Sequence, residues 1–235
     1  MTSARRASLA LLMVVLVGGA FAGGYAFHRL PSSRITTAAP TTSTTTPVTT
    51  TTGDGAWMSL WPTAVTGVRY ASPTSAALAF ARHVLKMASP VAQSFQQGDA
   101  RSGEIPVRSG PTAPETFLLM RQLASDASWW VLGAVASDIE IDAPRSLAVV
   151  TSPLRVSGRS TAFEALVNLA LYQDGTVIPL ARGTAMGGSM GQRASYATSL
   201  AFATSSAPFG TLVVFTRSAK DGSVLEASAI RVRFA

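Results

Sequence analysis

The sequence opens with an uncharged apolar segment that limits where the rest of the chain can fold. Residues 7–27 contain no charged side chain and follow Arg5 and Arg6. As a helix they would be about 31 Å long at ~1.5 Å per residue, enough to cross the ~30 Å hydrocarbon core of a bilayer. The two arginines favour a cytoplasmic N-terminus, residues 1–6. We therefore expect a single-pass anchor at residues 7–27 in the cytoplasmic membrane, with the later domains outside the cytoplasm.

This segment also admits two other interpretations. Ala20 and Ala22 flank Phe21 in the small-x-small pattern of a signal-peptide cleavage site, and cleavage there would release a secreted protein. Gly19 and Gly23 have the GxxxG spacing of closely packed membrane helices, although small residues are also common in signal segments. We favour an uncleaved anchor, because the apolar run is longer than a signal peptide requires.

A linker follows the apolar segment. Residues 31–55 contain eleven threonines and three prolines. They have almost no large apolar side chain, so they cannot bury a core and are predicted to be disordered. A flexible chain of this length spans ~25–30 Å on average, which would hold the following domains away from the membrane.

Residues 56–138 combine one helical segment with strand-like runs. Ser72 is placed to cap a helix that begins with Pro73, and apolar residues then recur at three-to-four-residue spacing. The strand-like runs are residues 105–108, 116–123 and 128–136. One helix followed by an antiparallel sheet predicts a small α+β domain.

Four tryptophans accompany this unit. Trp57 and Trp61 have helical spacing, and they either return to a membrane surface or fix the linker to the first domain, which we favour. Trp129 and Trp130 lie in a run that is apolar on both faces, so that strand must be covered on both sides. We expect these two in the core, with a sugar-stacking platform as the alternative.

Residues 139–235 contain only short strand-like runs with turn signals between them, about seven in all, a pattern typical of an all-β sandwich. Asp174 and Gly175 predict a tight hairpin turn, because Asp-Gly supplies the positive φ that such turns need. A second turn is expected at residues 220–222. In the last strand, the apolar residues Ile230, Val232 and Phe234 alternate with Arg231 and Arg233. Strand geometry therefore predicts the apolar three in the core and both arginines in solvent.

Several motifs in this region follow one another in a recognisable order. They are SPLRVSG at residues 152–158, Phe163 and Glu164, Asp174 and Gly175, Ala207 to Phe209, SAKDGS at residues 218–223, and the ending at residues 231–234. Together they resemble the immunoglobulin-like domain of bacterial spore germination proteins over roughly residues 139–235. The resemblance implies an extracytoplasmic sandwich with no assigned catalytic residues. The segments at residues 98–108 and 128–134 are similar to those preceding this domain in actinobacterial single-pass membrane proteins.

Composition excludes several kinds of functional site. The chain has no cysteine, which rules out disulfides, thiolate metal ligands, cysteine nucleophiles and attachment through a lipobox cysteine. Its only histidines are His28 and His83, so a histidine zinc site is not expected. Basic residues exceed acidic ones by 19 to 12, but they are spread along the chain without a basic stripe, so nucleic acid is not an expected partner.

Acidic residues form two possible groups. Asp138, Glu140 and Asp142 would share one face of a strand, as in a hard-cation site, but an exposed edge strand is the favoured interpretation. Asp99 and Glu104 lie in a Gly-flanked loop and resemble an acid/base pair, although a surface ion-pair loop is favoured there.

Two further features lack the context of a site. The GGSMG loop at residues 187–191 has neither the lysine nor the strand-to-helix setting of a phosphate-binding loop, and it is expected to connect two strands. His83 has no second histidine or acidic residue nearby in sequence, so a surface or half-buried helix position is expected.

We therefore predict no catalytic, cofactor-binding or metal-binding residue and no cofactor. The predicted protein is membrane-anchored, extracytoplasmic and non-enzymatic, with an immunoglobulin-like domain that binds an envelope protein or cell-wall polymer or serves as a structural module. The resemblance also implies a loose link to spore germination. The alternative is an envelope enzyme or enzyme accessory with a small-molecule pocket in the α+β domain. A cavity between the helix and residues 129–135 would favour that alternative, whereas a filled core would favour the binding module.

Overall fold

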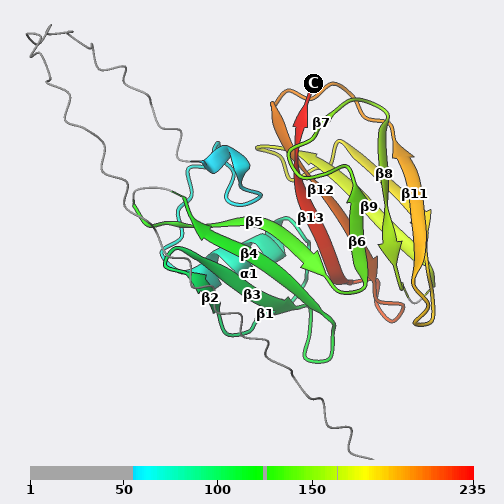
Figure 1. The fold of residues 1–235 in the computed structure, drawn as a ribbon, viewed down its shortest axis with the longest axis horizontal. Helices are drawn as coiled ribbons and strands as arrows, with labels where there is room; N and C mark the ends of the chain where they lie inside the picture. Colours follow the sequence, from blue (N-terminus) through cyan, green and yellow to red (C-terminus); the bar gives the residue numbers. More distant parts are fainter. Residues whose placement is uncertain (1–54, 124–125, 163) are drawn as a thin grey trace, which may run out of the picture. The chain divides into compact units, whose positions relative to one another are not determined.

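The computed structural model describes residues 55–123, 126–162 and 164–235 (Figure 1). The predicted anchor at residues 7–27 and residues 31–54 of the predicted linker lie outside the described residues. Within the described ranges, no helix combines the length and the apolar character needed to cross a membrane. The described fold is mostly antiparallel β-sheet with one short α-helix, as the sequence predicted for this part of the chain.

The elements fall into two halves along the chain. The first half contains η1 (Ala56–Met58), α1 (Pro73–His83), β1 (Val91–Ala92), β2 (Gln96–Asp99), β3 (Ser102–Arg108), β4 (Glu115–Gln122) and β5 (Trp129–Ala136). The second half contains β6 (Ile139–Ala143), β7 (Val149–Val150), β8 (Leu154–Ser160), β9 (Leu166–Gln173), β10 (Ala181–Met186), β11 (Ala194–Leu200), β12 (Phe209–Arg217) and β13 (Val224–Phe234).

Helix α1 begins and ends for local reasons. The Ser72 hydroxyl accepts a hydrogen bond from the Ser75 amide at 3.2 Å, and Pro73 occupies the first turn, where its missing amide costs nothing. These features confirm the predicted helix start. Beyond its C-terminal end, Lys86 has a left-handed φ of 62°. The Met87 amide then donates to the Ala81 carbonyl at 3.0 Å, which satisfies a carbonyl of the last turn.

The strands form two sheets. The large sheet has the order β1-β3-β4-β5-β13-β12-β9-β10, with β2 added beside β3 and β7 beside β13, and the small sheet has the order β11-β8-β6. The large sheet passes from the first half to the second where β5 pairs with β13 at Ala134 and Ala229. The described residues all lie within one compact unit, so the predicted boundary between residues 138 and 139 lies beside a continuous sheet. Independent folding of the two halves stays a prediction.

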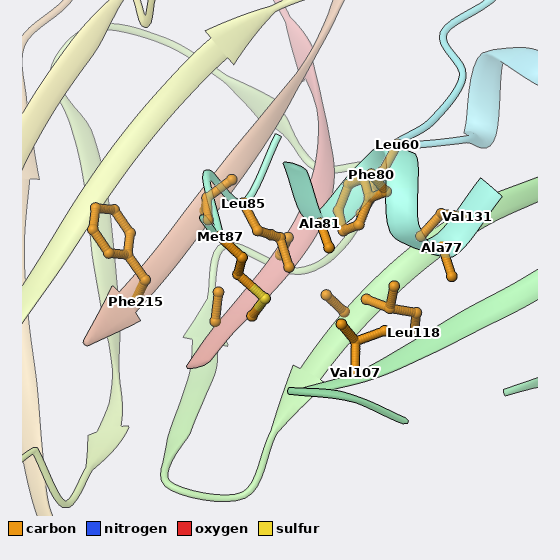
Figure 2. Packing of buried hydrophobic residues seen from close by; sticks show 14 of the residues in the cluster. Leu60, Ala77, Phe80, Ala81, Leu85, Met87, Val107, Leu118, Val131 and Phe215 are labelled. Carbon is orange, nitrogen blue, oxygen red and sulfur yellow. The ribbon is translucent and has the colours of Figure 1, made fainter. Parts of the chain in front are cut away.

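Two cores lie on opposite faces of the large sheet. One fills the sandwich between the two sheets and contains Leu169, Leu212 and Val232. The other lies beneath α1, where Phe80 packs with residues of β3, β4 and β5, and it continues through Leu85 and Met87 to Phe215 of β12 (Figure 2). Strands β9 and β12 are therefore buried on both faces, which explains their nearly continuous apolar sequence.

The tryptophans lie mostly where the sequence predicted. Trp130 is fully buried, and half-buried Trp129 packs edge-on against Phe95, which confirms a core role. Trp61 exchanges backbone hydrogen bonds with Val131, and its indole N–H donates to the Tyr70 hydroxyl at 3.2 Å, so it does fix the chain entry to the first half. Trp57 differs: it packs on Phe209 of the second half, with ring centroids 5.6 Å apart.

Two predictions for the sandwich are wrong in part. β9 and β10 form the expected antiparallel hairpin, but residues 174–180 connect them instead of a tight turn, although Gly175 does have a positive φ of 80°. In β13, Val232 and Phe234 are buried, Ile230 is partly buried and Arg233 is exposed, as predicted. Arg231, predicted to face solvent, is instead fully buried.

Candidate functional site

Arg231 is buried because other segments cover the outer face of the large sheet beside it. Its guanidinium makes two hydrogen bonds to the Asp174 carboxylate, each at 2.5 Å, while its Nε–H donates to the Trp57 carbonyl at 2.9 Å. Its guanidinium also lies 5.1 Å from the centre of the Phe209 ring. This one side chain therefore joins β13 to the β9–β10 connection and to the chain entry at η1.

A cavity lies next to this ion pair, with a volume of about 130 Å³. Four segments line it: residues 60–66 of the chain entry, the C-terminal end of α1, residues 172–177 at the β9–β10 connection, and Thr211 of β12. A cavity of ~150 Å³ with apolar walls accommodates a molecule of the size of benzene. The space here therefore suits one ring-sized group.

The wall of this cavity contains one polar atom with no hydrogen-bond partner in the described part of the chain. Thr63 is 7% exposed, and its Oγ1 is buried without a partner. Two other threonine hydroxyls of the wall are already used, because Thr66 Oγ1 donates to the Thr63 carbonyl at 2.9 Å and Thr176 Oγ1 donates to the Gln173 carbonyl at 3.2 Å. The Thr63 hydroxyl is therefore a buried polar group in the wall that lacks a hydrogen-bond partner.

Aromatic and apolar side chains complete the cavity and its surroundings. The Trp61 ring stacks on His83, with centroids 5.4 Å apart and an angle of 22° between the ring planes. Three aliphatic residues of the two loops are strongly exposed: Val65 (68%), Val177 (65%) and Ile178 (75%). We call these three residues the apolar rim. Exposed apolar clusters beside a cavity are typical of binding surfaces.

The acidic residues singled out in the sequence at 138–142 do not form a metal site. Glu140 pairs with Arg159 at 2.8 Å and with Arg193 at 2.6 Å, and Asp142 lies 3.8 Å from Arg159. Across the described ranges, no group of acidic residues and histidines is arranged to hold a metal ion. Strand β6 is the edge of the small sheet, which confirms the favoured interpretation of an edge strand.

Asp99 and Glu104 belong to the β2–β3 hairpin instead of a catalytic pair. The Asp99 carboxylate accepts a hydrogen bond from the Arg101 amide at 2.7 Å. This bond, followed by one from Ser102, lowers the pKa of Asp99, so the carboxylate stabilises the turn as an anion. Glu104 lies within β3 opposite Gln96. The predicted loop is therefore a strand hairpin.

The two remaining features occupy the expected kinds of position. Residues 187–191 connect β10 to β11, and the Gly188 amide donates to the Ser160 carbonyl at 3.2 Å, which fixes one end of this loop. His83 is exposed at the end of α1. Its position against Trp61 at the cavity was not predicted, because Thr63, His83 and Val177 come from three separate segments and form no sequence motif.

Residues 139–235 form two antiparallel sheets packed over a common core, and this defines an immunoglobulin-like β-sandwich domain. In agreement with the fold, residues 138–223 match the family model of the immunoglobulin-like domain of bacterial spore germination. The match confirms the resemblance seen in the sequence. No curated protein and no solved structure matches the chain.

Proposed function

We propose that this protein is a membrane-anchored, non-enzymatic binding module of the cell envelope that recognises its partner through the cavity at the end of α1. The immunoglobulin-like domain supports a binding role, since the matching family carries no assigned chemistry. The uncharged segment at residues 7–27 supports anchoring, and the threonine-rich linker supports a position outside the cytoplasm.

The cavity and the exposed apolar rim beside it carry this proposal. A buried polar group without a hydrogen bond costs about 1–3 kcal/mol, so the Thr63 hydroxyl makes this wall locally unfavourable. The apolar rim supplies additional contact area around the entrance. Binding is favoured over catalysis because the carboxylate of the site, Asp174, is already held by Arg231.

The absence of cysteine allows a specific test of the binding surface. The variant Val177→Cys has a single cysteine in the whole chain. Met186→Cys, at the far end of β10, is a matched control because Val177 and Met186 are both 65% exposed. In intact cells, a thiol-directed crosslinker should couple Val177→Cys to an envelope component far more than Met186→Cys. Equal coupling from both positions contradicts a binding surface at the rim.

A second pair of variants tests whether the rim contributes affinity. Ile178 and Met190 are each 75% exposed, and only Ile178 belongs to the rim. Introducing a charge into an apolar contact costs a desolvation penalty. Ile178→Asp should therefore reduce crosslinking through Val177→Cys about tenfold or more, whereas Met190→Asp should not change it.

Membrane topology is tested separately. Protease added to intact protoplasts should digest residues 56–235, because anchoring through residues 7–27 with the N-terminus inside places them outside. A cytoplasmic marker should survive the same treatment. Domains that resist protease until the protoplasts are lysed contradict the proposed orientation.

The enzymatic alternative receives no support from the interior of the first half. The space between α1 and β5 is filled by Phe80, Leu118 and Val131, all fully buried. A filled core at this place favours the binding module, and the cavity lies instead at the end of α1. The alternative stays a prediction, as does a link to spore germination, which is supported by the family description alone.

A further inference from the structure

Two arginines lie on the outer face of the sandwich, and Lys86 of the first half is close enough to one of them, Arg182, to be affected by its charge. Arg182 of β10 lies opposite Ala170 of β9, and Arg217 ends β12, next to Phe215 on the same face. Both arginines are close enough to Tyr172 to affect its pKa, which burial raises and the two positive charges lower. Lys86 follows α1 and lies near Arg182. We call Lys86, Arg182 and Arg217 the cationic cluster.

In the described part of the chain no carboxylate forms an ion pair with these side chains, and Glu164 lines a surface pocket together with Arg217. The ion pairs within the described ranges involve Arg69, Arg108, Arg159, Arg193 and Arg231, and none includes a member of the cationic cluster. Burial, and then the charge of Arg182, lower the pKa of Lys86. Because like charges repel one another, a bound anion would be stabilised by the cluster.

Neutral hydrogen-bond donors lie beside the two arginines. A second, open cavity of about 240 Å³ includes Asn168, Thr184, Arg182 and Arg217 in its lining. Asn168 and Thr184 are opposite each other in the β9–β10 pair, so their side chains share the face that carries Arg182. Arg217 is held in place, since its guanidinium lies 5.0 Å from the Phe215 ring centre and donates to the Gly222 carbonyl at 2.6 Å.

Lys86 occupies a backbone position that favours glycine. Its φ of 62° lies in the left-handed region, which a residue with a Cβ adopts only with backbone strain. Glycine is the usual residue at such a position after a helix. The chain therefore bears both backbone strain and charge repulsion at Lys86, and a binding role for the ammonium group accounts for both.

From this arrangement we propose that the cationic cluster binds a phosphate-bearing anionic polymer. Guanidinium groups match phosphate oxygens in geometry and charge, and Asn168 and Thr184 supply further donors. The open cavity allows a polymer to continue beyond the bound phosphate. The cationic cluster is separate from the α1 cavity. The phosphate-binding proposal and the function proposed for the α1 cavity can therefore be disproved independently.

The first test measures binding of fluorescent polyphosphate to the purified full chain in a nonionic detergent. Arg182→Gln and Arg217→Gln should each weaken binding roughly tenfold, because each removes charge-assisted hydrogen bonds. Arg155→Gln is the matched control, since Arg155 is exposed on β8 and belongs to no ion pair of the described residues. Equal weakening by all three variants, or equal binding of polyglutamate and polyphosphate, overturns the proposal.

Lys86→Gly is a more specific test, because it should keep or raise the thermal stability of the protein but lower its affinity for polyphosphate. Glycine relieves the left-handed strain, so the thermal midpoint of Lys86→Gly should equal or exceed that of the wild type. Polyphosphate affinity should nevertheless fall severalfold, and Lys86→Gln should lose affinity without the gain in stability. Wild-type affinity in both Lys86 variants contradicts a phosphate site that uses this residue.

Discussion

Arg231 is fully buried, and its hydrogen-bond partners determine how this burial affects the free energy of unfolding. The guanidinium donates to the Asp174 carboxylate and to the Trp57 carbonyl, so its charge is neutralised by one segment and a remaining N–H is satisfied by another. A buried ion pair gains little over an apolar pair of the same size, but removal of one partner leaves the other charge buried and unpaired. The pair therefore makes β13, the β9–β10 connection and the chain entry at η1 depend on one another.

We expect Arg231→Met to lower the free energy of unfolding by about 3–5 kcal/mol, because Asp174 is left without its cation. Arg233→Met, two residues further along the same strand but exposed, should change it by less than ~0.5 kcal/mol. Urea unfolding of the purified chain measures both values. The double variant Arg231→Met, Asp174→Asn should cost less than the sum of the two single changes, and strict additivity would contradict a direct interaction.

The contrast between Arg231 and Arg233 also shows what the sequence can reveal at this scale. Alternation in the last strand correctly separates the core residues from the two arginines, because strand geometry is local. It does not reveal what covers the second face. For Asp174 the sequence predicts only a turn, because Asp-Gly is a turn signal. Its role as the partner of Arg231 depends on a contact between residues 57 positions apart in sequence.

Among the elements, β6 and β8 approach each other closely at Gly158. A Cβ at Gly158 would lie 1.9 Å from the Glu140 carbonyl oxygen and 2.5 Å from the Tyr196 hydroxyl oxygen. The space is needed because the Tyr196 hydroxyl crosses this point to donate to the Glu140 carbonyl at 2.6 Å. Gly158 belongs to one of the motifs that carry the family resemblance, and this contact gives it a structural reason.

Gly158→Ala should therefore destabilise the small sheet. The added methyl must push β6 away from β8 or break the Tyr196 hydrogen bond, and we expect a loss of about 1–3 kcal/mol in the free energy of unfolding. Gly110→Ala is a suitable control, because nothing lies within 4 Å of a Cβ at that position. Similar midpoints of denaturation for Gly158→Ala and Gly110→Ala would argue against the close approach.

Strand β13 gives a second test at the level of elements. Phe234 is 8% exposed and packs on Phe202 with ring centroids 5.6 Å apart. Phe234→Ala should lower the free energy of unfolding by about 3–5 kcal/mol, since a cavity adds to the lost transfer energy. Arg233→Ala should cost less than ~0.5 kcal/mol. A harmless Phe234→Ala would contradict the register of β13 and with it the C-terminal part of the sandwich.

At the scale of the whole molecule, one sheet unites the two halves. The Ala136 amide donates to Ser228 Oγ at 3.0 Å, and the Ala227 amide donates to Thr116 Oγ1 at 3.1 Å, so hydroxyl groups replace backbone bonds where β5 meets β13. The helix, most strands and the sandwich follow from capping and alternation, which are local signals. The junction and the α1 cavity do not, because they form only when segments far apart in sequence meet.

Glu226 lies near this junction in an unfavourable setting for a carboxylate. It is 3% exposed, and its Oε2 has no hydrogen-bond partner among the described residues. Burial, followed by repulsion from Asp138, raises its pKa to about 7, while a backbone bond from Asp138 and the charge of Arg193 act in the opposite direction. Glu226 therefore remains protonated in the folded protein at pH values where it is ionised in the unfolded chain.

This difference predicts how stability depends on pH. In the unfolded chain Glu226 loses its proton near pH 4.5, whereas in the folded protein it keeps the proton up to a pH of about 7. Between these values the folded state binds more protons, so its stability must fall as the pH rises, by on the order of 3 kcal/mol, and then level off. Glu226→Gln is neutral at every pH and should remove this decline, so that the variant gains stability over the wild type at pH 8 but hardly at pH 4. Urea unfolding at a series of pH values measures the difference between the two proteins, which cancels the contributions of all other titrating groups. A difference that stays constant from pH 4 to pH 8 would mean that Glu226 ionises at its ordinary pKa in the folded protein and is not confined at the junction.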